Sequence, residues 1–306
     1  MAIAANRYTT TELLADIRRK GHIPPNQTPF QDADLLAMAD FELQTSILSQ
    51  IRSCRENYFL TYTDFSISSD SNYKIPLRAI GSALSAVQLV VGTTIYQIDR
   101  VEISQQFSTL TSPNGFYSFY IQGNSVVVLP SPTTGTIRLW FYTRPNTLIS
   151  PTAAAQVSSV SGNVITCLSV PTTFTTGTPL DIIKDQPGFE ALLLDTRPTL
   201  IAGVAVTIPG TPTTTIEGDW VALAGQTPVP QIPVEFRPLL IQRVVVKYYE
   251  SQGYLDKMKA AQAKLVEMQQ DILQLINPRV AEAPKRVVAD SGLIGGYSRS
   301  MKYRAT

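Results

Sequence analysis

The residue types that perform most enzyme chemistry are scarce in this 306-residue sequence. It contains one histidine, His22, and two cysteines, Cys54 and Cys167. A zinc site needs about four ligands, and a Ser–His–Asp triad needs a base. Because the three residues are scattered along the chain, the sequence argues against a Cys/His zinc site and against a histidine-based triad. We expect two free structural thiols, although one disulfide is arithmetically possible.

His22 has two interpretations. In the functional one it is a general base or a metal ligand. In the structural one it is a connector residue that follows the basic end of a helix (Arg18, Arg19 and Lys20), where positive charge is favoured. We favour the structural interpretation.

Two groups of carboxylates could carry chemistry. The first could hold Mg²⁺ and consists of Asp32, Asp34 and Asp40, but acids in the first turn of a helix explain two of these without a metal. The second could be a glycosidase pair and consists of Asp181, Asp185 and Glu190, although no group of tryptophans surrounds it for sugar stacking. A glycine-rich phosphate loop with a lysine is also missing. We therefore expect no catalytic residues, no metal and no cofactor.

The segment after Pro278 is basic although the net charge of the chain is only +1. This segment contains six basic and two acidic residues, which gives it a net charge of +4. The remainder of the chain therefore carries about −3. A solvated, disordered end is one interpretation. The other is an arm that docks on an acidic surface or near nucleic-acid phosphate. We favour the arm because rings and cations alternate in it, and its candidate contact residues are Arg279, Lys285, Arg286, Tyr297, Arg299, Lys302, Tyr303 and Arg304.

The secondary-structure elements that must position these residues divide the chain into zones. In the first zone, residues 8–60, the pattern predicts helices. Thr9 and Glu12 fit a capping box, and Gly21 fits the position just past the C-terminus of the same helix. A second helix is expected from Phe30. Its apolar stripe consists of Leu36, Ala39 (or Asp40), Leu43, Ile47 and Ile51.

The middle of the chain predicts strands. Between residues 58 and 145, strands at roughly ten-residue spacing indicate an antiparallel meander. A hairpin is expected from 157–160 and 164–170, with further strands at 191–194, 200–208 and 220–223. The segment 226–233 contains three prolines and reads as an extended linker.

Residues 234–277 predict helices again. Pro238 suits a first turn, Gly253 is expected to break or kink the helix, and Asn277–Pro278 ends it. The apolar stripe consists of Leu240, Val244, Tyr248, Leu255, Met258, Leu265, Met268, Ile272 and Leu275.

Helices this short are not stable alone, so we expect those of both chain ends to pack together. The predicted fold class is α+β: a discontinuous helical bundle from both ends, with a large antiparallel β insertion and an extended C-terminal arm. The predicted domains are a bundle of 1–57 and 234–277, an insertion of 58–233 and an arm of 278–306. Charged residues make up only 16% of the chain, below the usual ~25%, which favours a surface covered by neighbouring subunits.

The helical ends resemble head–tail connector proteins of tailed bacteriophages, also called adaptor or neck proteins. The segments that carry the resemblance are 11–24, 30–36, 218–221, 228–233, 239–240 and 260–268. The resemblance implies a structural virion protein that forms a ring, commonly of twelve copies, between the portal and the tail. It implies ring contacts through the bundle and docking of the residues after Pro278 on the portal. The large β insertion departs from the smallest members of the family.

The expected partners are therefore further copies of the chain, the portal, a tail or nozzle protein, and genomic DNA that passes through the channel without sequence-specific binding. The start of the chain lacks a signal-peptide pattern, and no apolar run is long enough to span a membrane. We expect a protein made in the host cytoplasm and located in the virion neck, with no membrane contact. The alternatives are a β-rich tail or receptor-binding module that recognises a host surface or glycan and, less favoured, a hydrolase on a β scaffold.

Overall fold

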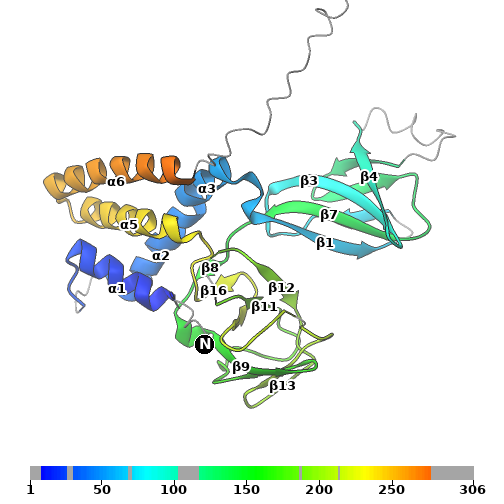
Figure 1. Cartoon of the computed structure of the whole chain (residues 1–306). Helices are drawn as coiled ribbons and strands as arrows, with labels where there is room; N and C mark the ends of the chain where they lie inside the picture. Colours follow the sequence, from blue (N-terminus) through cyan, green and yellow to red (C-terminus); the bar gives the residue numbers. More distant parts are fainter. Residues whose placement is uncertain are drawn as a thin grey trace, which may run out of the picture.

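The computed structural model of the chain is rich in β-structure and describes residues 8–25, 30–67, 71–102, 117–185, 188–212 and 214–276. Figure 1 shows two curved sheets beside a smaller group of helices. The predicted class, a helical bundle with a β insertion, is wrong. The strands contain more residues than the α-helices, and each sheet buries an apolar core of its own. The helices are thus one of three packed bodies and do not form the core of the whole fold.

The first sheet is seven-stranded. In pairing order its strands are β1 (Leu60–Ser66), β7 (Thr136–Thr143), β3 (Ala79–Val91), β4 (Thr94–Arg100), β5 (Ser118–Gln122), β6 (Ser125–Leu129) and β2 (Asn72–Lys74). Alternate residues of β7 are buried, among them Leu139 and Phe141. The predicted antiparallel meander is wrong in its strand order, because β7 lies between β1 and β3, and β2 pairs with β6. It is also wrong in direction at one pair, because β4 and β5 pair in parallel through Asp99 and Ser118. A parallel pair needs a crossover connection, and residues 103–116 of that connection lie outside the described part of the chain.

The second sheet is also seven-stranded, and all of its neighbouring strands are antiparallel. In pairing order its strands are β12 (Ala191–Thr196), β11 (Leu180–Ile183), β15 (Trp220–Leu223), β9 (Ala155–Ser161), β10 (Val164–Cys167), β14 (Ala205–Thr207) and β13 (Leu200–Ala202). The hairpin predicted around Gly162 is confirmed as β9 and β10. The single strand predicted over 200–208 is wrong: Gly203, with φ at 59°, turns the chain into a second hairpin, a conformation that glycine adopts without strain.

The helices of both chain ends bury one shared apolar core. They are α1 (Thr10–Gly21), α2 (Asp32–Glu42), α3 (Leu48–Cys54), α5 (Arg237–Ser251) and α6 (Leu255–Ile276), with 3₁₀ turns at Glu56–Phe59, Pro151–Ala153 and Val234–Phe236. A π-helical turn, Leu43–Ile47, joins α2 to α3. In Figure 1 the yellow α5 lies beside both α6 and α1. Leu240 and Val244 of α5 are fully buried in this core.

The observed helix boundaries agree closely with those predicted from the sequence. The capping box of Thr9 and Glu12 is confirmed, as is Pro238 in the first turn of α5. Gly253, with φ at 71°, separates α5 from α6. The position expected for Gly21 is wrong by one residue, because Gly21 is the last residue of α1 and His22 takes the left-handed conformation. A side chain at Gly21 would meet Ile23 at 3.0 Å and Val245 of α5 at 3.5 Å, so this glycine permits close packing.

The segment predicted as a linker is extended, and it is also buried. Its start, β16 (Gln226–Thr227), pairs in parallel with β8 (Thr147–Leu148), and all residues from Thr227 to Pro233 are buried. The Pro228 carbonyl accepts from the Thr10 amide at 2.8 Å, and the Gln231 side chain accepts from the Asn146 amide at 3.1 Å. This segment therefore ties β8 and the second sheet to the helices.

Candidate functional site

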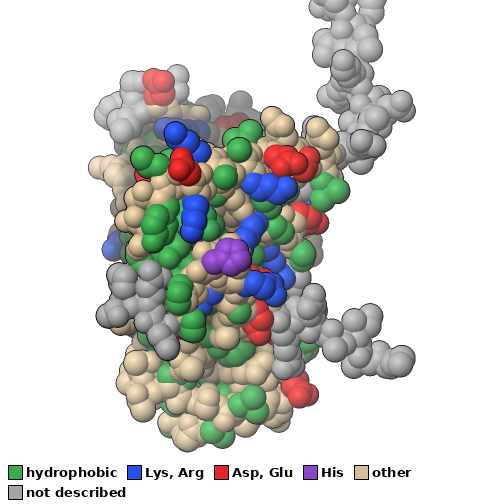
Figure 2. Space-filling view, turned by 90° about the vertical axis from the view of Figure 1, so that its left-hand side faces the viewer, with side chains coloured by type: hydrophobic (Ala, Val, Ile, Leu, Met, Phe, Trp, Pro, Cys, Tyr) green, Lys and Arg blue, Asp and Glu red, His purple; other side chains and the backbone are tan. Residues whose placement is uncertain are grey.

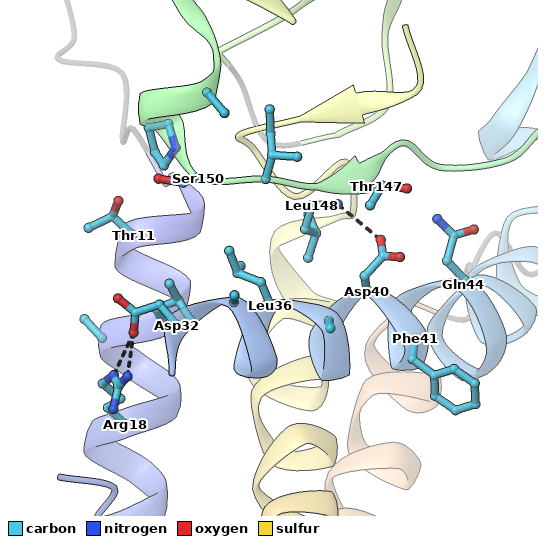
Figure 3. Close-up of a pocket in the computed structure, with 17 residues that line it drawn as sticks. Thr11, Arg18, Asp32, Leu36, Asp40, Phe41, Gln44, Thr147, Leu148 and Ser150 are labelled. Carbon is cyan, nitrogen blue, oxygen red and sulfur yellow. Dashed lines mark hydrogen bonds and ion pairs between the residues drawn. The ribbon is translucent and has the colours of Figure 1, made fainter. Parts of the chain in front are cut away.

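A groove lies open on the surface of the helical body. It has a volume of about 940 Å³ and lies between α1, α2 and the chain that runs from β8 to Ala153. We call it the α2 groove; its lining residues are Thr11, Leu14, Ala15, Arg18, Asp32, Ala33, Leu36, Ala37, Asp40, Phe41, Gln44, residues 147–151 and Ala153. Figure 3 shows Leu36 and Leu148 facing each other across it.

Local sequence explains why the α2 groove stays open. Ala15 of α1 and Ala33 and Ala37 of α2 line it, and their short side chains leave space that longer ones would fill. One end is closed by an ion pair, in which the Arg18 guanidinium contacts an Asp32 carboxylate oxygen at 2.5 Å. The groove therefore has a mainly apolar wall with a fixed polar boundary at the start of α2.

Asp40 is the only carboxylate in this groove that no cation partners among the described residues. Its Oδ1 accepts from the Leu148 amide at 3.1 Å, the dashed line at the centre of Figure 3. Burial raises the pKa of Asp40, against the lowering effect of hydrogen bonds from Leu148 and Gln44. A desolvated carboxylate of this kind favours a positively charged partner.

Phe41 marks the edge of the groove and has 61% of its surface exposed. In Figure 3 its ring points away from β8. On its other side lies a second hollow of about 510 Å³, which we call the α5 hollow; it is lined by Ala37, Met38, Phe41, Lys247, Glu250 and Ser251. A large aromatic ring between two hollows is typical of a protein-docking surface, where such rings anchor the partner.

A second exposed apolar feature lies on α6. Leu255, Val266 and Leu273 are exposed, and their spacing of eleven and seven residues places them on one face of the helix. We call this face the α6 stripe; it also contains Lys259 and Gln262. Other α6 residues pack against the helical core, namely Met258, Ala261, Leu265, Met268 and Ile272. The α6 stripe is thus an exposed face that carries three apolar residues among polar ones, on a helix that is already anchored.

His22 lies where its interpretation as a connector residue predicts, at the end of α1. The residue follows the last turn of α1, and its backbone amide donates to the Arg18 carbonyl. In Figure 2 the histidine, in purple, lies among Lys and Arg side chains at the end of the helical body. Within the described ranges, no group of three His, Cys, Asp or Glu residues is arranged to hold a metal ion.

The three aspartates near α2 point to different partners. Asp32 pairs with Arg18, Asp34 accepts from the Gln31 amide at 3.0 Å, and Asp40 accepts from Leu148. The structure therefore does not bring them together as a Mg²⁺ site.

The three residues of the second carboxylate group also lie in different surroundings. Asp181 is fully buried and accepts from Arg78, Asp185 accepts from the Trp220 indole at 3.1 Å, and Glu190 is exposed. One feature that the sequence did not predict is an ion pair between Arg78 and Asp181, which joins the two sheets and which we call the Arg78–Asp181 clamp. Arg78 precedes β3 and contacts both oxygens of Asp181 on β11 at 2.8 Å. No spacing in the sequence relates these two residues.

Both cysteines have free thiols. Cys54 ends α3, and Cys167 is buried in the core of the second sheet. Burial raises the pKa of Cys167 to about 11, which makes its thiol a poor nucleophile near neutral pH. The candidate arm residues, from Arg279 to Arg304, lie outside the described residues.

None of the helices that the structure describes is both long enough and apolar enough to cross a bilayer. No protein-family model matches the chain, and no curated protein is significantly similar to it.

Proposed function

We propose that this chain is a structural subunit of a phage head–tail connector, a ring that joins the portal to the tail around the DNA channel. The sequence resemblance supplies the family. The observation that carries the proposal is the α2 groove, an apolar hollow with Phe41 exposed at its edge. An apolar groove with an aromatic ring at its edge can anchor a partner protein, so this one fits a subunit whose neighbours cover it.

The charge of the chain supports the same proposal. Its net charge is +1 and its charged fraction is 16%. Tight, non-specific DNA binding requires many cations along the backbone path. A near-neutral subunit suits a channel through which DNA must pass without being held.

We assign the portal contact to the basic segment after Pro278, whose net charge is +4. A chain that ends at Asn277 tests this assignment. It should fold and assemble with itself but no longer join portal-containing heads to tails. If the shortened chain still completes virions, the arm does not make the contact that we assign to it.

The proposal as a whole is tested by electron microscopy of virions in which this chain carries a label. The label should lie in the neck, between head and tail. A label found at fibres, at the tail tip or inside the head would contradict a connector role.

A specific hollow favours a second candidate, glycan recognition by the first sheet. This hollow has a volume of about 420 Å³, and its lining includes Tyr96, Gln97, Asp99 and Tyr117. Rings, a carboxylate and an amide can stack on and hydrogen-bond to a sugar. A glycan-array signal of the full chain that Tyr96→Ala abolishes would favour this candidate, and a blank array would exclude it.

A further inference from the structure

We infer that the α6 stripe of one copy docks in the α2 groove of a second copy. This inference rests on the proposed ring and names the two surfaces that build it. The two surfaces have no residue in common: one is formed by α1, α2 and β8, the other by α6. An interface between two different surfaces can repeat from copy to copy and close into a ring.

The lengths of the two surfaces agree. The part of the helical rod that lines the groove runs from Asp32 to Gln44, which is about 18 Å at 1.5 Å per residue. The stretch from Leu255 to Val266 on α6 covers about 17 Å by the same measure. An amphipathic helix that lays its apolar residues into a groove is a common mode of recognition.

The charges of the two surfaces agree as well. Asp40 is half-buried in the groove, and Lys259 is exposed on the stripe. Among the described residues neither belongs to an ion pair. A partly desolvated carboxylate favours a cation beside it, and a lysine from a second copy would supply one.

Sequence spacing sets the direction of docking. Asp40 lies four residues before Gln44, near one end of the groove, and Lys259 lies four residues after Leu255, near one end of the stripe. The stripe stays within the groove only when these two near ends coincide. With Lys259 beside Asp40, Leu255 therefore lies at the Phe41 end of the groove, and Val266 lies toward Leu36. The docked α6 runs antiparallel to α2 of its neighbour.

Two variants, each with one disabled surface, test the inference on the full-length chain. Phe41→Asp places a charge at the groove edge, and Val266→Asp places one on the stripe. Both side chains are exposed, at 61% and 49%, so the fold should be kept, and a circular-dichroism melt verifies this. Leu77→Asp is the matched control, since Leu77 is 91% exposed and lies beside the first sheet.

Native mass spectrometry and sedimentation give the readout. Wild type and Leu77→Asp should assemble, and each single variant should lose self-affinity by about a hundredfold. An equimolar mixture of the two variants should form dimers and stop there, because only one intact groove and one intact stripe remain per pair. A wild-type chain that stays monomeric at 0.1 mM (roughly the upper range of transient affinities), assembly by both single variants, or a mixture that forms no dimer would each overturn the inference.

The contact between the two charges has its own test. Asp40→Asn keeps an acceptor for the Leu148 amide but removes the charge, and Lys259→Gln removes its partner. Each should weaken assembly by about tenfold, and the double variant should be little worse than either single one. Fully additive effects would show that the two residues do not meet.

The outcomes separate this inference from the proposed function. If the virion label lies in the neck while both surface variants still assemble, the inference fails and the connector role stands. If the variants dissociate as expected while the label lies elsewhere, the surfaces build a different assembly and the connector role fails.

Discussion

The Arg78–Asp181 clamp and the α2 groove both join elements that are distant in the sequence, but they differ in how completely their polar groups are partnered. Asp181 accepts from the Arg78 guanidinium, the Asn146 side chain and the amides of Asp195 and Gly225. Asp40 in the groove accepts hydrogen bonds, but no cation among the residues that the structure describes pairs with it. The clamp is complete within one chain, whereas the groove is incomplete. We propose that the clamp serves the stability of the chain and that the groove serves assembly.

The largest effect is expected at the clamp. Arg78→Gln leaves the fully buried Asp181 carboxylate without its cation, and removing one partner of such a pair costs about 3–5 kcal/mol. Urea unfolding followed by fluorescence should show this loss of stability. A loss below about 1 kcal/mol would mean that the two sheets do not depend on the clamp.

At the groove edge we expect the opposite: a small effect on stability and a large effect on assembly. Phe41→Ala removes an exposed ring, so the free energy of unfolding should change by no more than about 0.5 kcal/mol. Self-assembly should weaken by about a hundredfold, as expected for an aromatic anchor. Denaturation of the monomer and sedimentation of the assembly, measured on the same preparation, check both parts. A large loss of stability with intact assembly would reverse the roles assigned to the two regions.

The pKa of Asp40 gives assembly a pH dependence. Burial raises this pKa, and a cation from a second copy would lower it again, so assembly favours the ionised form. Assembly should therefore weaken by about tenfold as the pH falls from 7 toward 4, near the ordinary aspartate value. Arg18 and Asp32, the other charged residues of the groove, are already paired.

Asp40→Asn is the control for this dependence. It should assemble more weakly at pH 7 and lose the part of the pH dependence that belongs to this carboxylate. An unchanged pH profile in the variant would assign the titration to another group.

The smallest effect is expected at the outer part of the clamp. Asp195 also contacts Arg78, at 2.8 Å, but 56% of its side chain is exposed. Exposed ion pairs contribute less than about 1 kcal/mol. Asp195 has a φ of 55°, which asparagine tolerates, so Asp195→Asn should cost less than this in a thermal melt. A cost comparable to that of Arg78→Gln would show that the clamp acts as one indivisible network.

Local signals predicted local structure well. The capping box of Thr9 and Glu12, the first-turn Pro238 and the break at Gly253 depend on residues close in sequence, and all three are confirmed. The hairpin at Gly162 is another example. Interactions of this range are set by backbone conformation and nearby hydrogen bonds, which the sequence states directly.

Long-range pairing could not be predicted in the same way. Alternation identified strands, but it does not say which strands pair, so the division into two sheets and the parallel pair of β4 and β5 were missed. Asp40 shows the same limit within the site. It occupied an ambiguous position of an apolar stripe, and only β8, more than a hundred residues away, reveals the groove beside it.

A cryo-electron-microscopy reconstruction of the virion neck tests the central claim most directly. The account predicts a ring of copies of this chain in which each α2 groove is filled by the α6 stripe of its neighbour, with Lys259 beside Asp40. A neck that lacks this chain, or one in which the groove faces solvent and Phe41 touches nothing, would contradict it.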